Sequence, residues 1–475
     1  MTRFLCILLS LITLSTTAGA QRSRLLGSWN GKLEAGGSSL TLVFHFTTDS
    51  LEKEQYFFLD SPDQGAEGIP GEIALLDNDS VSVTIPMLGA AYQGRLVLHE
   101  VPQGSRPSGE IQGVFTQMGM QFPLVLQMGL PVLNRPQEPQ PPYPYRSEKV
   151  TFSSGADGAV MAGTLTYPVG YDDNSSNSNN IPAVLMITGS GSQNRDEELF
   201  SHKPFLVLAD WLARHGIASL RYDDRGMGES ERGTVEITTQ TNMQDALAGI
   251  RYLRSLGEFD KVGALGHSEG GQIVFMLGAA EEADFIISMA GPGMRGDSIL
   301  VEQNRLILTK SGFTPASADN YGRVLAAMLR MKVDGYSTDS PETLVDSLIT
   351  ALDAQNMPFG SAANLAAAWN TVDDPWMLYF LQSSPARDIS RTTCPVFALN
   401  GSLDLQVPPV NLEHIRRLLP DGPHHLIKEY PGLNHLLQPC TTGMPAEYGR
   451  IETTIAPEVL TDIAEWILSV TDLSR

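Results

Sequence analysis

The chain has 475 residues, of which 42% are hydrophobic and 18% charged, and this length suffices for two domains with sizeable cores. These proportions are those of a globular protein and exclude a mainly disordered one. The formal net charge of −22 argues against nucleic acid or an anionic membrane as partner, because both would repel the protein.

The N-terminus is typical of an export signal. Arg3 precedes an apolar core over residues 4–14, and Ala18-Gly19-Ala20 has the small residues of a cleavage site. We therefore expect residues 1–20 to be a signal peptide and the mature protein to be soluble and periplasmic or secreted. Cys6 lies inside the apolar core, which argues against a lipid anchor. No later segment is long and apolar enough to predict a membrane span.

Residues 21–130 predict an all-β domain, either a barrel or a sandwich. Apolar and polar side chains alternate over residues 40–47 and 81–85, as in strands with one buried face. Short apolar runs at 96–98 and 114–115 indicate further strands. We expect a structural role beside a catalytic domain, with glycan or lipid binding as the alternative.

A proline-rich stretch over residues 131–147 predicts a semi-rigid linker, because proline favours extended backbone. The catalytic domain is expected over residues 148–475. Early in it, the apolar strand 183–187 runs into a Gly-Ser-Gly loop. Such backbone can turn its N–H groups toward a substrate oxygen, so Ser190 is expected to donate to an oxyanion. A merely flexible turn is the alternative.

The candidate nucleophile is Ser268, in the sequence Gly266-His267-Ser268-Glu269-Gly270. A strand pattern over residues 262–265 precedes this motif, and an apolar helix pattern follows it. Glycine on each side lets strand and helix close around a strained serine whose hydroxyl stays exposed. The backbone N–H of Glu269 is then the second expected oxyanion donor.

A serine nucleophile needs a base, and the base needs an orienting acid. Asp404 follows the strand pattern at 394–400, and His435 follows the strand pattern at 426–430. Both are therefore expected in turns at one edge of a parallel sheet, with a single helix at 410–419 between the two strands.

Other candidates fit the expected order less well. His267 lies inside the serine motif and should point away from the serine, and His424 and His425 come at the wrong end of the last strand. His202, His215 and His414 fall in or beside helices. Glu429 is the weaker rival acid, because it lies within a strand rather than after one.

Residues from about 148 to the end resemble the α/β-hydrolase superfamily. Besides the serine motif, residues 221–230 resemble the Asp-x-Arg-Gly-x-Gly-x-Ser turn of its monoacylglycerol-lipase-like and serine-aminopeptidase-like branch, where this turn is mainly structural. Thr188-Gly189 stands where many relatives have His-Gly. The resemblance implies an α/β sheet with the chain order serine, aspartate, histidine. It also implies that an insertion after the sixth strand covers the active site.

That insertion is expected to be a helical cap at about 294–388, with helices near residues 300–308, 316–331, 343–354 and 362–369. Met377, Tyr379 and Phe380 are expected to line an acyl pocket, with packing of the cap onto itself as the alternative.

The sequence therefore predicts a serine esterase that acts on a small acyl ester through Ser268, His435 and Asp404, without metal or cofactor. No His, Cys or acidic residues have metal-site spacing, and strand geometry argues against, without excluding, a bridge between Cys394 and Cys440. An amidase or aminopeptidase with the same triad is the main alternative. A non-catalytic binding protein is the remaining one.

Overall fold

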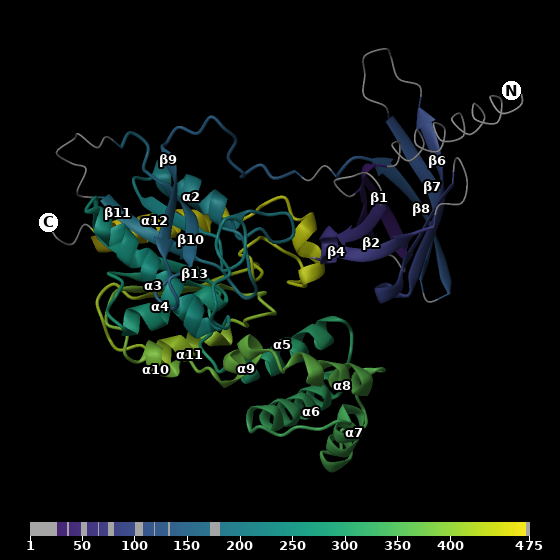
Figure 1. Cartoon of the computed structure of the whole chain (residues 1–475). Coiled ribbons are helices and arrows are strands. Elements are labelled where there is room, and N and C mark those ends of the chain that lie inside the picture. Colours follow the sequence, from purple (N-terminus) through teal and green to yellow (C-terminus); the bar gives the residue numbers. More distant parts are fainter. Residues whose placement is uncertain are drawn as a thin grey trace, which may run out of the picture. The chain divides into compact units, whose positions relative to one another are not determined.

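The computed structural model describes residues 26–35, 38–48, 55–64, 66–74, 80–99, 108–117, 119–131, 134–171 and 181–471. The expected signal peptide, residues 1–20, lies outside this part of the chain. The chain divides into two compact units between Asn134 and Arg135, and each unit has its own hydrophobic core (Figure 1). None of the helices in the described part of the chain is long and apolar enough to cross a membrane.

The first unit is a closed antiparallel barrel, which decides between the predicted barrel and sandwich. Each strand pairs with the next along the chain, and the last pairs with the first. The strands are β1 (Gly27–Ala35), β2 (Ser38–Thr48), β3 (Gln55–Ser61), β4 (Ala66–Ile73), β5 (Ser80–Ile85), β6 (Ala90–His99), β7 (Ser108–Gln117) and β8 (Met120–Met128). Short 3-10 helices follow β3 (η1, Pro62–Gln64) and β5 (η2, Pro86–Leu88). Closure leaves the sheet without an unpaired edge.

Aromatic side chains fill the interior of the barrel. Trp29, Phe44, Phe57 and Tyr92 are each at most 1% exposed. Phe44 meets Phe57 and Tyr92 edge-on, at ring-centroid distances of 5.2 Å in both pairs. The Tyr92 hydroxyl is itself satisfied, because it donates to the Ile111 carbonyl. A barrel of this size is just wide enough for side chains to fill, and here the described interior residues form a packed core.

The second unit is built on one mixed sheet with the strand order β16-β15-β14-β13-β11-β12-β10-β9. Its strands are β9 (Ser147–Ser153), β10 (Val160–Thr166), β11 (Ile181–Ile187), β12 (Ala218–Tyr222), β13 (Phe259–His267), β14 (Ile286–Met289), β15 (Val396–Gly401) and β16 (Leu426–Tyr430). Strands β11 to β16 are parallel, whereas β9 and β10 pair antiparallel. Parallel strands end at a common edge, so the turns after β11, β13, β15 and β16 meet there.

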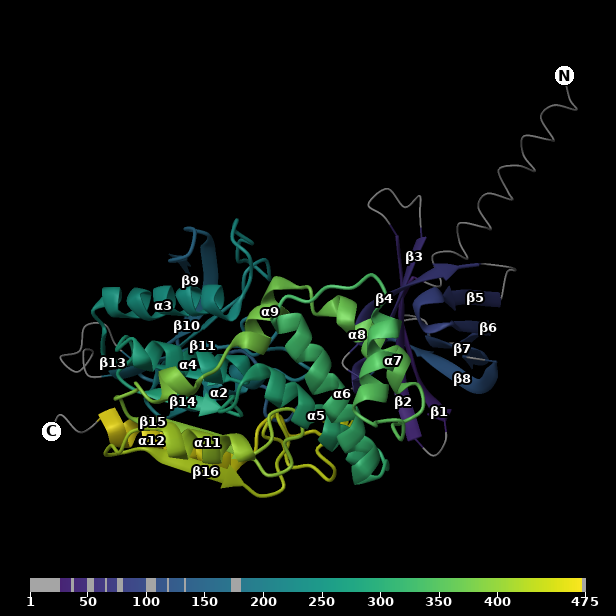
Figure 2. The same ribbon diagram turned by 90° about the horizontal axis from the view of Figure 1, so that it is seen from below.

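Helices cover both faces of this sheet (Figures 1 and 2). On one face lie α2 (Pro204–Arg214) and α12 (Pro457–Thr471); on the other lie α3 (Thr239–Leu256), α4 (Glu269–Ala279), α10 (Ala386–Ile389) and α11 (Val410–Leu418). Leu185 of β11 faces the α3 and α4 side, whereas Val184 and Met186 face the α2 and α12 side. Both faces are therefore buried, which explains why this strand is apolar without alternation.

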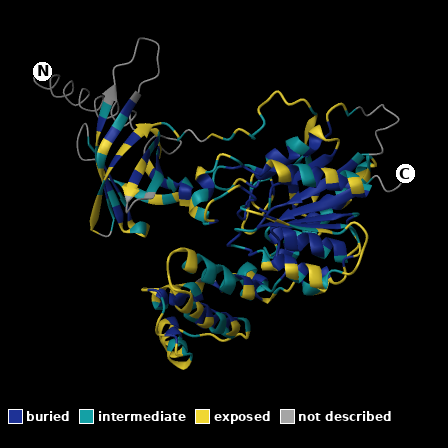
Figure 3. Ribbon diagram, turned by 180° about the vertical axis from the view of Figure 1, so that it is seen from behind, coloured by how far each residue is buried: buried dark blue, intermediate teal, exposed yellow. Residues whose placement is uncertain are grey.

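The insertion between β14 and β15 is a helical cap with its own small core. Its helices are α5 (Gly296–Lys310), α6 (Pro315–Val333), α7 (Pro341–Ala351), α8 (Ser361–Thr371) and α9 (Pro375–Gln382). Val324, Met328 and Trp369 are at most 2% exposed within that core. Figure 3 shows buried stripes on these helices beside exposed ones, as amphipathic helices require. The predicted helices 300–308, 316–331 and 362–369 lie within α5, α6 and α8, whereas the predicted helix 343–354 extends beyond the end of α7 at Ala351. Helix α9 forms from the apolar run at 376–381.

The proline-rich stretch is bound to the second unit at its start. Arg135 donates to the backbone carbonyls of Ser201, Gly449 and Ile451 at 2.8–3.0 Å. Gln137 is bound twice to the Ile455 backbone, through its amide nitrogen (2.7 Å) and its oxygen (3.1 Å). These bonds lie beside the short 3-10 helix η3 (Pro445–Arg450). From Arg135 onward, the linker is therefore part of the second unit.

Candidate active site

Ser268 stands on a sharp turn between β13 and α4. Its backbone angles are φ 53° and ψ −116°, a strained combination for a residue that has a Cβ. The Ser268 N–H donates to the Met289 carbonyl, and the Gly271 N–H donates to the Ser268 carbonyl, both at 2.9 Å. Strand, strained serine and helix therefore follow one another as the motif predicts. The serine is half-buried, and its hydroxyl has no hydrogen-bond partner among the described residues.

The two glycines of the motif are required by close backbone contacts. A Cβ on Gly266 would lie 2.0 Å from the Gly270 carbonyl oxygen, and one on Gly270 would lie 2.2 Å from the Ile187 carbonyl oxygen. Backbone atoms cannot yield at such distances without moving strand and helix apart.

We therefore expect Gly266→Ala to lower the free energy of unfolding by about 3 kcal/mol or more, as overpacking at a rigid site does. Gly155→Ala is the matched control, because its Cβ would have only an ordinary contact at 3.5 Å. Urea unfolding followed by circular dichroism measures both variants. Equal stability of the two variants would contradict this account of the turn.

Asp404 and His435 come together at the same edge of the sheet. The His435 Nδ1 lies 2.8 Å from Asp404 Oδ2, and both side chains are at most 4% exposed. The other carboxylate oxygen, Oδ1, accepts the backbone N–H groups of Gln406 and Val407 at 2.8 and 2.9 Å. The carboxylate is thus fixed on one side by backbone and directed on the other side at the imidazole.

The competing candidates lie elsewhere. His202 is fully buried, and burial lowers its pKa to about 4, although hydrogen bonds to backbone carbonyls oppose this. His424 and His425 precede β16, whereas His435 follows it. Glu429 is exposed within β16. The bonded acid and base are therefore the pair that the sequence predicts.

The loop after β11 lies against the serine turn. A Cβ on Gly189 would be 3.1 Å from the Cβ of Ser268. The Gly189 N–H already donates to Glu197 at 2.8 Å, so it is engaged within the protein. The Ser190 N–H has no acceptor in the part of the chain that the structure describes, and Glu269 opens α4, where helical geometry supplies no acceptor. The N–H groups of the two predicted oxyanion donors therefore have no acceptor among the described residues.

His267 is a residue whose surroundings the sequence does not reveal. Its ring is 3% exposed and bridges two loops: Nδ1 lies 2.9 Å from Glu197 Oε1, and Nε2 lies 3.0 Å from the His435 carbonyl oxygen. The rings of His267 and His435 are 4.8 Å apart, centre to centre. Because Glu197 is 70 positions away, no local pattern could have indicated this contact.

The turn after β12 connects several loops through charged side chains. The Arg225 guanidinium binds Asp245 at 2.6 Å and Asp157 at 3.0 Å. Asp223 accepts from Arg195 at 2.5 Å. These buried pairs agree with the structural role that the resemblance implies for this turn.

Asp224 connects the same turn to the loop after β11. Its carboxyl accepts hydrogen bonds from the Thr188 hydroxyl and the Gln193 N–H, both at 2.8 Å. Burial raises the pKa of Asp224 to about 8, although these two hydrogen bonds oppose the rise. The carboxyl is therefore mainly protonated in the folded protein at neutral pH.

This raised pKa makes the stability depend on pH. In the unfolded chain Asp224 loses its proton near pH 4, whereas in the folded protein it keeps the proton to about pH 8. The contribution of the neutral carboxyl to the free energy of unfolding is therefore complete below about pH 4 and falls as pH rises to about 8. Asparagine stays neutral, so we expect the free energy of unfolding of Asp224→Asn to rise by at least about 1 kcal/mol relative to that of wild type between pH 5 and pH 8. Unfolding midpoints measured across this range check it. A difference that stays constant with pH would contradict the raised pKa.

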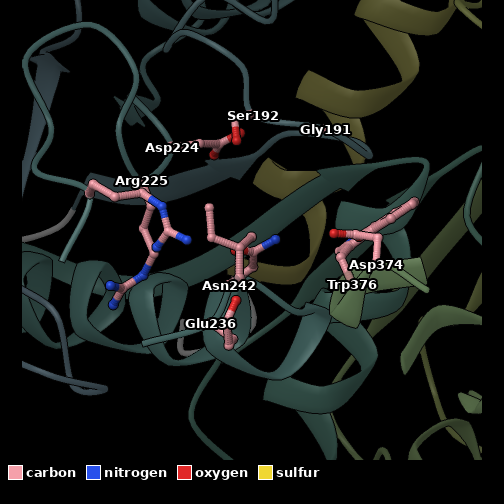
Figure 4. Close-up of a pocket in the computed structure, with 10 residues that line it drawn as sticks. Gly191, Ser192, Asp224, Arg225, Glu236, Asn242, Asp374 and Trp376 are labelled. Atoms are coloured by element: carbon pink, nitrogen blue, oxygen red, sulfur yellow. The ribbon is translucent and has the colours of Figure 1, made fainter. Parts of the chain in front are cut away.

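A polar pocket of about 260 Å³ adjoins the loop after β11 and the start of α9. Figure 4 shows Ser192 and Asp224 on one side of it, with Asp374 and Trp376 on another. The Trp376 indole N–H donates to the Glu269 carboxylate at 3.0 Å, so α9 is bound to the residue that follows the serine.

The predicted acyl-pocket residues on α9 have different surroundings. Phe380 is buried in the cap core and stacks on Trp376 at a centroid distance of 5.6 Å. Met377 packs against the same core. Tyr379 lines a second, more open pocket on the α3 side. Within the run 376–380, the Trp376 side chain is hydrogen-bonded to the residue that follows the serine.

Both described cysteines, Cys394 and Cys440, are free thiols. The described residues contain no group of three His, Cys, Asp or Glu side chains that could hold a metal ion.

The fold and the strained serine turn define an α/β-hydrolase, with a barrel domain before it. More closely, the chain belongs to the family described as X-Pro dipeptidyl-peptidase (S15 family), whose profile matches residues 157–427. The matched range contains Ser268 and Asp404 and ends before His435.

Individual relatives are named as esterases and as a peptidase. The esterase EstD of Thermotoga maritima is 23% identical over 309 residues, which cover 65% of this chain and 65% of EstD, slightly less than two thirds of that protein. Similar solved structures include the esterase Pf2001 of Pyrococcus furiosus, with 12% identity, coverage of 72% of this chain and 99% of the esterase, and a TM-score of 0.39. The proline iminopeptidase of Mycobacterium smegmatis has 14% identity, coverage of 69% and 100%, and a TM-score of 0.40.

Proposed function

We propose that the protein is a serine hydrolase that cleaves carboxylic esters through an acyl-enzyme on Ser268. The observation that carries this proposal is the hydrogen-bonded Asp404–His435 pair at the sheet edge where the strained Ser268 turn also lies. A buried carboxylate bound to Nδ1 keeps the proton on that nitrogen and leaves Nε2 free to act as base.

In the proposed reaction His435 takes the Ser268 proton as the hydroxyl attacks the ester carbonyl. The oxyanion accepts hydrogen bonds from the N–H groups of Ser190 and Glu269. His435 then protonates the leaving alcohol, and water releases the acyl group by the same steps in reverse order. A hydrogen bond between the Ser268 hydroxyl and His435 is expected to form when substrate binds, because catalytic hydrogen bonds are often made only in the complex.

Peptide or amide cleavage by the same residues is the second candidate. Two observations favour it: the description of the family, and the carboxylates of Glu236 and Asp374, which line the polar pocket that adjoins the loop after β11. Such carboxylates could bind a free amino group. The name of the EstD relative favours ester cleavage. An ester also needs less protonation of its leaving group than an amide does.

Two substrate series distinguish these candidates. We expect turnover of p-nitrophenyl esters with short acyl chains, weak or no turnover of aminoacyl p-nitroanilides, and covalent labelling by a fluorophosphonate. A preference for the anilides would favour the peptidase. No turnover of either series together with no labelling would refute the hydrolase proposal and favour a binding protein on this scaffold.

A further inference from the structure

We infer that His267 is a permanently protonated positioning residue, an imidazolium that holds the loop of the base His435 and the loop beside the nucleophile in place. This inference rests on the proposed function for its catalytic consequence, whereas the protonation state is argued from the contacts, burial and charges around the ring, which do not involve a substrate.

Both ring nitrogens of His267 face oxygen atoms that accept hydrogen bonds. Nδ1 lies 2.9 Å from a Glu197 carboxylate oxygen, and Nε2 lies 3.0 Å from the His435 carbonyl oxygen. A carbonyl oxygen has no proton to donate, so Nε2 must carry one. A neutral imidazole has only one N–H and would then direct the lone pair of Nδ1 at the carboxylate. Two protons on the ring satisfy both contacts.

The same carboxylate oxygen of Glu197 also accepts the Gly189 N–H at 2.8 Å. Glu197 is 1% exposed, and a buried carboxylate of this kind needs a cation or several donors to remain charged. His267 supplies the cation. Burial lowers the pKa of His267, but the Glu197 charge and hydrogen bond outweigh it, and the pKa lies above its ordinary value.

The other charged groups around the His267–Glu197 pair are acidic or lie at the catalytic site. Asp404 favours the imidazolium through its charge. The Asp224 carboxyl lies close enough to Glu197 for the two to interact, but it is mainly neutral at pH 7. The His435 ring is the neighbouring base.

The catalytic consequence is preorganisation. His267 binds Glu197, and Glu197 accepts the Gly189 N–H, so His267 holds Gly189 in place. Gly189 packs closely on the serine turn, where a Cβ on it would lie 3.1 Å from the Ser268 Cβ. Through its other nitrogen, His267 fixes the backbone of His435. Movement of either loop by about 1 Å is expected to cost on the order of 10²-fold in turnover.

The protonation state is tested by ¹⁵N NMR of histidine-labelled protein, in the Ser268→Ala form so that the readout is independent of turnover. His267→Gln identifies the signal. We expect both His267 nitrogens to carry a proton at pH 7 and to keep it to higher pH than an ordinary histidine does, because Glu197 holds the pKa of His267 above its usual value. A neutral His267 at pH 7 would overturn the inference, whatever the substrate.

The positioning role is tested by kinetics with the ester found above. We expect His267→Gln to lower kcat by about 10²-fold with little change in KM, and to move the acid limb of the kcat/KM profile to higher pH because Glu197 is left uncompensated. Glu197→Gln removes the carboxylate and, with it, the reason for His267 to stay protonated, so this variant should lower kcat but leave that limb near its wild-type pH. His215→Gln, on the exposed end of α2, is the matched control. An equal upward shift of the limb in both variants would overturn the role, whereas a wild-type protein inactive on every substrate would refute the proposed function instead.

Discussion

Replacing Ser268 by alanine is expected to abolish ester turnover, with a fall in kcat on the order of 10⁶-fold, as loss of a nucleophile in other serine hydrolases produces. The reason is that Ser268 combines the strained turn with the two proposed oxyanion donors, Glu269 and Ser190. The variant should also lose all fluorophosphonate labelling. Steady-state assays and intact-protein mass spectrometry measure the two effects.

The Ser268→Ala variant should remain folded, because alanine keeps the Cβ and therefore the same backbone strain. Its unfolding midpoint should match that of wild type. Ser255→Ala is the control for serine removal, since Ser255 is exposed on α3 and its hydroxyl bonds only to its own helix. Retention of full turnover by Ser268→Ala would refute the assignment of the nucleophile.

Local sequence patterns could predict the serine turn and its partners, because each depends on short-range requirements. The glycines at 266 and 270 are set by backbone contacts within one strand–turn–helix unit. Asp404 and His435 each follow a strand by a few residues, so the common edge of a parallel sheet brings them together. Such information is present in the spacing of residues along the chain.

The surroundings of the site could not be predicted in the same way, because they depend on contacts between distant segments. Glu197 meets His267 across 70 positions, and Trp376 meets Glu269 across 107. Neither pair has a local signature. The apolar run at 376–380 suggested a pocket wall, but an amphipathic pattern does not say which side chain turns toward the serine and which toward the cap core.

The barrel illustrates a similar limit. Alternation over residues 40–47 and 81–85 predicted strands with a buried face, and Phe44 and Val83 are indeed fully buried. Alternation fixes which face of a strand is buried but not which strand pairs with which. Strand β4 contains two glycines and a proline, so its apolar–polar alternation is too weak to predict a strand that the closed barrel needs. The alternation pattern therefore fits a sandwich and a barrel equally well, and the pairing of β8 with β1 distinguishes them.

The second large effect is expected for Asp404→Asn, which should lower kcat by about 10⁴-fold without unfolding the protein. Two backbone N–H groups, from Gln406 and Val407, point at one oxygen of this side chain. The asparagine carbonyl must take that position, so its amide N–H₂ turns toward His435 Nδ1. The imidazole then carries its proton on Nε2, facing the serine, and cannot act as base.

Because the cause is a tautomer rather than a lost contact, KM should change little and the fold should be unaffected. Glu429→Gln is the matched control, since it makes the same chemical change at the exposed rival carboxylate in β16. It should leave kcat within about twofold of wild type, as expected for a surface change. A loss below tenfold for Asp404→Asn, or a larger loss for Glu429→Gln, would show that the acid of this site had been assigned to the wrong residue.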